Sequence, residues 1–175
     1  FQEEDRKLRV TESAMKYFSS LKVPLVINTK ANLIISDDRY FNLIASHKAP
    51  IIFNVTIITL DKSIAKKMEP FAPPPQDRLD LIGRLREIGI PTVVYMAPVI
   101  PQAGYDFKEF AGAVVKSGAA SIHVRPLYTT GWMSKSKYWQ DVYSKNKTSF
   151  VRNGAGWMTS NEYMIDAAHE IRDEA

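Results

Sequence analysis

Polar residues alternate with apolar ones in the strongly β-branched segment IIFNVTIIT, residues 51–59. Successive side chains of a strand point to opposite faces, so Asn54 and Thr56 share one face while Phe53 and Val55 share the other. A strand that helices cover on both faces should be apolar throughout. The polar pair therefore predicts either a face that lines a cavity or buried polar groups that hydrogen-bond to their neighbours.

Charged residues stand at the ends of two other apolar segments. Lys30 follows VPLVINT and is placed either to bind an anion or to be solvated. In SIHVRPL, His123 and Arg125 alternate onto one face. An arginine inside a strand is rarely buried without a partner, so Arg125 should bind a carboxylate or phosphate ligand or pair with Glu69 or Asp61. His123 has no second metal ligand at short spacing, which favours a hydrogen-bonded histidine of the core.

Four strand-like segments, alternating with helix-like ones, must position these residues. We expect strands over residues 23–29, 51–59, 92–99 and 121–127. Apolar spacing, N-cap residues and glycine or proline stops predict helices over residues 6–21, 36–48, 61–68, 76–88, 107–116, 135–146 and 159–173. Such alternation is typical of α/β proteins with a parallel sheet, in which right-handed crossovers place the strands in sequence order.

The expected fold class is thus α/β, a parallel sheet of about four strands with flanking helices. Both a doubly wound sheet and part of a (β/α) barrel fit, although no glycine-rich nucleotide loop follows any strand. In both folds functional residues gather at the carboxyl ends of the strands. Period-two alternation with apolar neighbours predicts that Asn54, Thr56 and Arg125 face away from the helices. We place residues 1–130 in this unit and residues 131–175 in a C-terminal helical segment.

Composition excludes several classes of protein. The 175 residues carry a net charge of +4 and contain no cysteine, which excludes disulfides, thiolate zinc sites and cysteine-ligated clusters within these residues. No apolar run reaches the roughly 18 residues that a membrane span needs, and the start FQEEDRKLR is no signal peptide. We therefore expect a cytoplasmic protein with no membrane partner. Because the chain begins with Phe1 and a half barrel leaves two sheet edges unpaired, we expect either a longer polypeptide or a homodimer formed through an edge.

A basic cluster interleaved with aromatic residues occupies residues 135–152 and could bind nucleic acid. It contains Lys135, Lys145 and Arg152 together with Trp139 and Tyr143. The competing interpretation, which we favour, is a solvated helix face with aromatic residues packed beneath it.

Three segments of the chain resemble radical S-adenosylmethionine (SAM) enzymes of the spore photoproduct lyase-like group. They read INTKANLIISDD, FNVTIITLDKSIAKKMEPFAPPPQDRL and GIPTVVYMAPVIPQAGYD. In that group a Thr-Lys-Ser strand end, a strand ending Thr-Leu-Asp, a Glu-Pro-x-Ala-Pro-x-Pro loop and a strand ending Ala-Pro-Ile-Ile-Pro follow in this order. The resemblance covers roughly residues 1–127, and Ala31 and Phe71 stand where the group usually has Ser and Arg.

The resemblance implies strands three to six of a radical SAM-type (β/α) barrel. Such enzymes bind a four-iron four-sulfur cluster through a CxxxCxxC loop after the first barrel strand and cleave SAM to a radical that abstracts hydrogen from the substrate. The parent protein would then use SAM and this cluster, with the cluster ligands upstream of this chain. Lys30, Asn54, Thr56 and Arg125 correspond to strand-end positions that face cofactor or substrate in the group.

Three functional hypotheses follow. The leading one is a fragment of a radical SAM enzyme with an unknown substrate, inactive as an isolated piece. The second is a cysteine-free α/β module that binds nucleic acid through residues 135–152. The third is an unrelated α/β enzyme that uses Lys30 or Arg125 on an anionic substrate.

Overall fold

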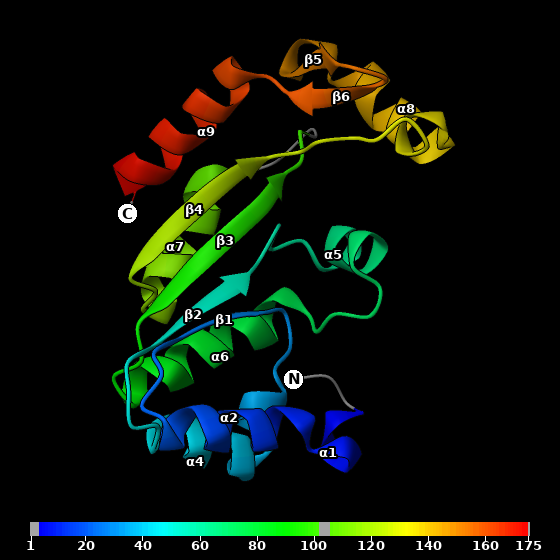
Figure 1. Ribbon diagram of the computed structural model, residues 1–175. Helices are drawn as coiled ribbons and strands as arrows, with labels where there is room; N and C mark the ends of the chain where they lie inside the picture. Colours follow the sequence, from blue (N-terminus) through cyan, green and yellow to red (C-terminus); the bar gives the residue numbers. More distant parts are fainter. Residues whose placement is uncertain (1–3, 102–105, 175) are drawn as a thin grey trace.

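A four-stranded parallel sheet forms the centre of the molecule (Figure 1). The computed structural model describes residues 4–101 and 106–174. The strands are β1 (Leu25–Thr29), β2 (Ile51–Thr56), β3 (Thr92–Val99) and β4 (Ser121–Pro126), and they pair in sequence order. The predicted fold class, strand order and parallel pairing are therefore confirmed.

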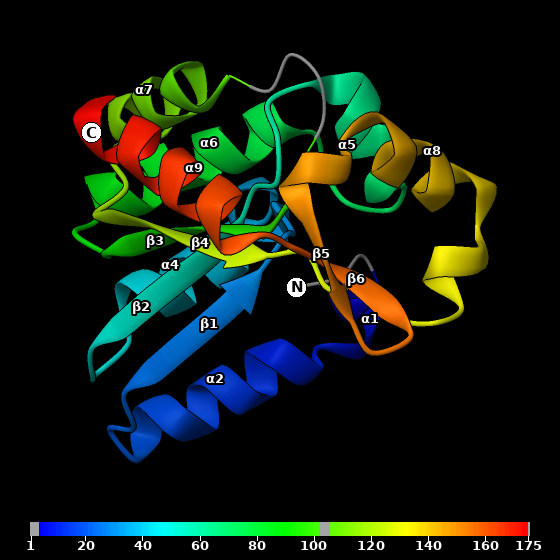
Figure 2. The same ribbon diagram turned by 90° about the horizontal axis from the view of Figure 1, so that it is seen from above.

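Helices cover one face of this sheet. α6 (Pro75–Glu87), α7 (Phe107–Ser117) and α9 (Asn161–Glu174) lie on the same side of the strands (Figure 2). The core between the two layers is apolar because each element turns one set of side chains inward. It includes Phe53, Val55, Ile57, Leu81, Ile82, Leu85, Val94, Phe110, Val114, Ala167 and Ile171. The opposite face of the sheet carries no such layer in the part of the chain that the structure describes.

The N-terminal helix differs from the prediction of one helix over residues 6–21. It is divided into α1 (Asp5–Leu8) and α2 (Val10–Ser20) by Arg9, which has a left-handed backbone with φ of 55°. The Asp5 carboxylate explains the break, because it accepts a hydrogen bond from the Thr11 amide at 3.0 Å and from the Tyr40 hydroxyl at 2.6 Å. A tertiary contact to a buried tyrosine thus interrupts a segment whose apolar spacing favours a continuous helix.

Aspartate caps begin the two helices that follow β1 and β2. After the short α3 (Leu33–Ser36), α4 (Asp38–Ala45) is capped by Asp37. Hydrogen bonds from the side chain and amide of Arg39, together with the charge of Arg6, lower the pKa of Asp37 to about 2. α5 (Lys62–Met68) begins at Asp61, whose carboxylate accepts hydrogen bonds from the amides of Ser63 and Ile64. Both aspartates are N-cap residues of the kind from which the helices over residues 36–48 and 61–68 were predicted.

A β-hairpin that the sequence did not predict follows the sheet. β5 (Phe150–Asn153) and β6 (Gly156–Thr159) pair antiparallel, after a 3₁₀ turn η1 (Met133–Lys135), helix α8 (Lys137–Lys145) and a second turn η2 (Lys147–Ser149). β6 also bonds to the chain just after β4, where the amide of Thr129 donates to the carbonyl of Trp157 at 2.8 Å. Because Thr159 belongs to this hairpin, the last helix begins two residues later than predicted, at Asn161.

Only glycine fits at one position of this hairpin. A Cβ atom added at Gly156 would lie 1.9 Å from the carbonyl oxygen of Thr129. The close approach lets β6 extend the hydrogen bonding beyond the end of β4. α9 shares the main core, whereas the hairpin packs on a second cluster. The domain boundary near residue 130 stays a prediction.

Every helix within residues 4–101 and 106–174 is too short or too polar to traverse a lipid bilayer.

Candidate functional site

The inner face of the sheet, opposite the helices, carries the residues expected from the alternating pattern. Phe53 and Val55 are fully buried among the helices, whereas Asn54 and Thr56 are half-buried on the other face. Arg125 is exposed on the corresponding face of β4, where Ile122 and Val124 turn toward the core instead. The predicted orientation of Asn54, Thr56 and Arg125 is confirmed, while their role as cofactor ligands stays a prediction.

An amide pair connects the first two strands on this inner face. Asn28 and Asn54 are register partners in the parallel pair β1–β2. The Nδ2 group of Asn54 donates to Oδ1 of Asn28 at 2.9 Å. Each side chain keeps further donor and acceptor capacity, because one amide group offers two N–H donors and two acceptor lone pairs.

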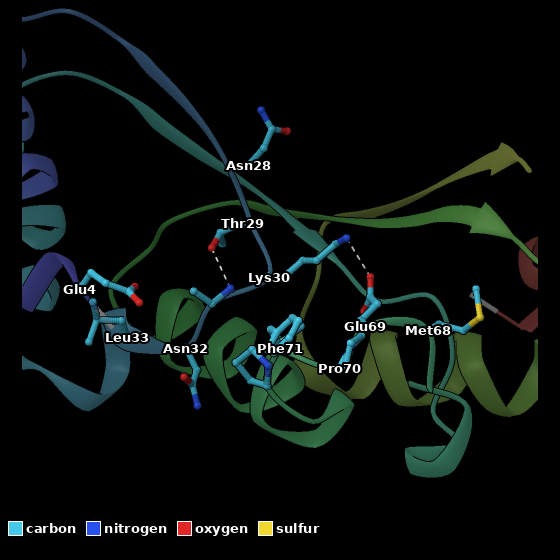
Figure 3. A pocket seen from close by; sticks show the side chains of 13 residues that line it. Glu4, Asn28, Thr29, Lys30, Asn32, Leu33, Met68, Glu69, Pro70 and Phe71 are labelled. Atoms are coloured by element: carbon cyan, nitrogen blue, oxygen red, sulfur yellow. Dashed lines mark hydrogen bonds and ion pairs between the residues drawn. The ribbon is translucent and has the colours of Figure 1, made fainter. Parts of the chain in front are cut away.

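A pocket of about 880 Å³ opens at the carboxyl end of β1 (Figure 3). Its walls come from three places in the sequence: Glu4 near the N-terminus, the end of β1 with the turn that follows it, and the end of α5 with the proline loop that follows it. The lining residues are Glu4, Asn28, Thr29, Lys30, Ala31, Asn32, Leu33, Met68, Glu69, Pro70, Phe71, Ala72 and Pro73. Parallel α/β folds bind ligands at this end of their strands, so the pocket is the candidate site.

Lys30 projects across this pocket to the proline loop, as Figure 3 shows. Its ammonium lies 2.9 Å from Oε1 of Glu69, and its side chain is 48% exposed. The turn that presents Lys30 is fixed by Thr29, whose hydroxyl accepts a hydrogen bond from the Ala31 amide at 2.9 Å. Lys30 is therefore a positioned cation and not a freely solvated one.

The other oxygen of Glu69 binds a residue that sequence reasoning missed. Arg78 of α6 has a side chain only 1% exposed, and its Nη1 lies 2.6 Å from Oε2 of Glu69. The same Nη1 donates to the carbonyl of Thr56 at 2.8 Å, and Nε donates to the carbonyl of Pro73 at 3.0 Å. Arg78 thus joins α6, the end of β2 and the proline loop behind the pocket wall.

A signal for Arg78 was present in the sequence. Arg78 precedes Ile82 by four residues and Leu85 by seven, so it lies on the buried stripe of α6. A buried arginine needs a carboxylate and carbonyl acceptors. Glu69, nine residues earlier at the start of the proline loop, supplies the carboxylate.

Arg125 and His123 lie away from this pocket. Glu69 is bound by Lys30 and Arg78, and Asp61 caps α5, so neither carboxylate is the predicted partner of Arg125. Within the described residues Arg125 has no ion-pair partner. The prediction of a core histidine was wrong: His123 is exposed on the inner face, and its ring centroid lies 5.1 Å from that of Tyr95.

The aromatic residues of the C-terminal region pack mainly inward. Trp139, Tyr143 and Trp157 border a second hydrophobic cluster formed by Ile58, Ile100, Leu127 and Phe150. Tyr143 and Trp157 stack with ring centroids 3.9 Å apart. This arrangement agrees with the interpretation of aromatics beneath a solvated face.

Helix α5 adds lysines beside that region. Figure 2 shows α5 next to α8, and the ammonium of Lys67 lies 4.3 Å from the ring centroid of Tyr138. A smaller hollow of about 380 Å³ lies between the two helices. Basic residues from distant parts of the sequence therefore share one surface.

Sequence comparisons find relatives without an assigned role. No known protein-family model matches the chain. An uncharacterised protein of Acidianus two-tailed virus is 32% identical over 96 residues, which cover 54% of this chain and 31% of the relative. An uncharacterised protein of Mycobacterium tuberculosis is 32% identical over 118 residues, covering 62% of this chain and 34% of the relative. The chain thus spans about a third of the length of these curated relatives.

Solved structures are also similar to the chain, one of them over nearly all of its length. A spore photoproduct lyase variant with bound AdoMet and dinucleoside spore photoproduct matches with a TM-score of 0.62 and 14% identity, over 97% of this chain and 53% of that one. Streptococcus suis SuiB bound to S-adenosylmethionine matches with a TM-score of 0.52 and 18% identity, over 65% of this chain and 25% of that one. The chain has a radical SAM-like fold. At these identities the likeness concerns the fold, and the strand-end site must be argued from its own residues.

Proposed function

We propose that this chain is the part of a radical SAM enzyme of the spore photoproduct lyase-like group that holds strands three to six of the barrel. The observation that carries the proposal is the position of Lys30. By the resemblance, Lys30 corresponds to a strand-end position that faces cofactor or substrate. The residue lines a pocket and is ion-paired with the glutamate of the Glu-Pro-x-Ala-Pro motif. The likeness to an AdoMet-bound structure over 97% of the chain supports the same assignment.

The residues of the pocket fit SAM but not an iron–sulfur cluster. The 175 residues include no cysteine, and no group of three or more His, Asp or Glu side chains within the described residues could hold a metal. In this proposal cluster ligands belong to another part of the parent protein, and the isolated chain is inactive. In the parent protein bound SAM, cleaved with one electron from the cluster, would supply the radical that abstracts hydrogen from the substrate.

Each proposed ligand has a chemical counterpart in the cofactor. The Lys30 ammonium binds the carboxylate of SAM, since a charge-assisted hydrogen bond to a carboxylate is among the strongest a side chain can make. The amides of Asn28 and Asn54 and the hydroxyl of Thr56 bind hydroxyl and ring nitrogen atoms. Arg125, on the far strand of the same face and without an ion-pair partner among the described residues, binds an anionic group of the substrate.

Titration of the chain with SAM tests this assignment. Isothermal titration calorimetry should show saturable binding, weakened about tenfold or more in Lys30→Met, which removes one charge-assisted contact. Lys116→Met is the matched control, because Lys116 is exposed on α7, remote from the pocket. Equal affinity of wild type and Lys30→Met, or no saturable binding by wild type, would contradict the proposal.

Binding of nucleic acid is a second candidate function. The observation that favours it is the surface shared by Lys67 of α5 and Tyr138 and Lys145 of α8. Single-stranded nucleic acid binds to basic grooves that contain aromatic rings, with strong dependence on salt. Fluorescence anisotropy of a labelled oligonucleotide should show binding that weakens between 50 and 200 mM salt, because contacts to phosphate groups release counterions. The affinity should also fall in the double variant Lys67→Gln/Lys145→Gln. Lys116→Gln again serves as the control.

We also propose that a second copy of the chain pairs with the free edge of β1. β1 is an edge strand in the described sheet, and Val26 is 63% exposed there. Alternate residues of a parallel strand bond to opposite neighbours, and the Leu25 amide bonds to Pro50 on the β2 side, so the amides of Val26 and Asn28 point to the free edge. Sedimentation should show a dimer that Val26→Lys weakens and Val115→Lys, on α7, leaves intact. A monomer at all concentrations would contradict it.

A further inference from the structure

Three charged side chains form a row from the core to the pocket. Arg78 is buried, Glu69 is 8% exposed and Lys30 is 48% exposed. One carboxylate bridges both cations, with its two oxygens 2.6 Å from Arg78 Nη1 and 2.9 Å from Lys30 Nζ. The order is therefore cation, anion, cation, and of the three only Lys30 has a side chain that is about half exposed.

The charges of this triad do not cancel. An isolated ion pair of Lys30 and Glu69 would be neutral, and the Glu69 carboxylate would repel an incoming anion. Arg78 cannot lose its proton in a protein, so Glu69 is neutralised from behind. The triad carries a net charge of +1, and that charge is available at the Lys30 ammonium.

Stability alone does not explain the buried cation. Replacing a buried ion pair by apolar residues of similar size is often neutral or stabilising. Arg78 is moreover imperfectly satisfied, because its Nη2 has no hydrogen-bond partner within the described residues. A buried arginine that leaves one donor unpaired adds a cost to this site.

We propose that Arg78 is a positioning residue that makes the pocket a receptor for one anionic group, a carboxylate or a phosphate. It neutralises Glu69, which in turn holds the Lys30 ammonium at the pocket. By binding the carbonyls of Thr56 and Pro73 it also fixes the strand end and the loop that carry the pocket wall. The identity of the anion as the SAM carboxylate rests on the proposed function; the anion receptor itself does not.

Net charge gives this inference a sharp test. Arg78→Met leaves the Lys30–Glu69 pair with no net charge, and anion affinity should fall about tenfold through the lost attraction. The double variant Arg78→Met/Glu69→Gln returns the site to +1, with a neutral amide oxygen still able to accept from Lys30. Anion affinity of the double variant should recover to within about threefold of wild type.

The measurement follows the Lys30 ammonium by NMR during titrations with acetate and with inorganic phosphate, which separate the two anion types. Amide spectra of each variant confirm that it is folded, and Lys116→Met is the control. If Arg78 acts only in packing, the double variant binds anions no better than Arg78→Met, and that result overturns the inference. Absence of anion binding by wild type overturns it too.

Calorimetry with SAM and with methylthioadenosine, which lacks the carboxylate, separates this inference from the proposed function. Wild type that binds phosphate or acetate but not SAM refutes the proposed cofactor and retains the anion receptor. If both hold, the preference for SAM over methylthioadenosine is lost in Arg78→Met and restored in the double variant.

Discussion

The Arg78→Met variant should lose a large part of the free energy of unfolding. The substitution removes hydrogen bonds to the carbonyls of Thr56 and Pro73 and the 2.6 Å ion pair with Glu69. Removing one partner of a buried ion pair costs about 3–5 kcal/mol. Lys30 still neutralises Glu69, which favours the lower end of this range, whereas the two carbonyls left unpaired favour the upper end.

Urea denaturation followed by circular dichroism measures this loss. With a slope of about 2 kcal/mol per molar urea, the midpoint should fall by about 1.5–2.5 M. Arg84→Met is a matched control on the same helix, because Arg84 is half exposed and its contact with Glu87 is 3.5 Å long. An exposed pair of this kind contributes only about 0–1 kcal/mol. Equal midpoint shifts for the two variants would refute the reasoning that burial and multiple partners make Arg78 critical.

Three further outcomes are expected. Gly156→Ala should destabilise the fold by about 1–3 kcal/mol, because the added Cβ would meet the Thr129 carbonyl. Gly112 is a helical position with open space around it, so Gly112→Ala should stabilise the fold by about 0.5–1 kcal/mol in the same thermal unfolding measurement. Phe71→Ala should leave the free energy of unfolding within about 0.5 kcal/mol of wild type, because the ring is fully exposed. Burial and the hydrogen bond to Asp5 raise the pKa of Tyr40 to about 12. The unfolded state therefore loses this proton first, and the free energy of unfolding should fall as pH rises from about 10 to about 12. Urea titrations at several pH values should show a shallower fall for Tyr40→Phe, and an unchanged slope would contradict the prediction.

Local patterns in the sequence were sufficient to predict the sheet. The β-branched residues and the two-residue period of the segment around Asn54 fix both the strand and its faces, because alternation is a property of every extended chain. The aspartate caps at Asp37 and Asp61 were equally local, since each carboxylate accepts from amides two or three residues ahead.

Features that depend on distant partners were not predictable in this way. The break at Arg9 requires the contact between Asp5 and Tyr40, which are 35 residues apart. The hairpin around Gly156 is short, and its pairing with Thr129 is what stabilises it. His123 was misplaced because alternation states which residues share a face, but not whether that face is covered.

The proline loop shows how the site can be derived from residue chemistry without any relative. Each proline removes an N–H donor but keeps its carbonyl, so a loop rich in proline has acceptors that its own backbone cannot satisfy. Here cationic side chains satisfy them: Lys66 donates to the carbonyl of Pro70 at 2.9 Å and Arg78 to that of Pro73 at 3.0 Å. The cation that fixes the loop also binds Glu69 at its start, and this contact orients the carboxylate toward Lys30. A glutamate before such a loop and an arginine on the buried stripe of the next helix therefore predict a charged, rigid pocket wall.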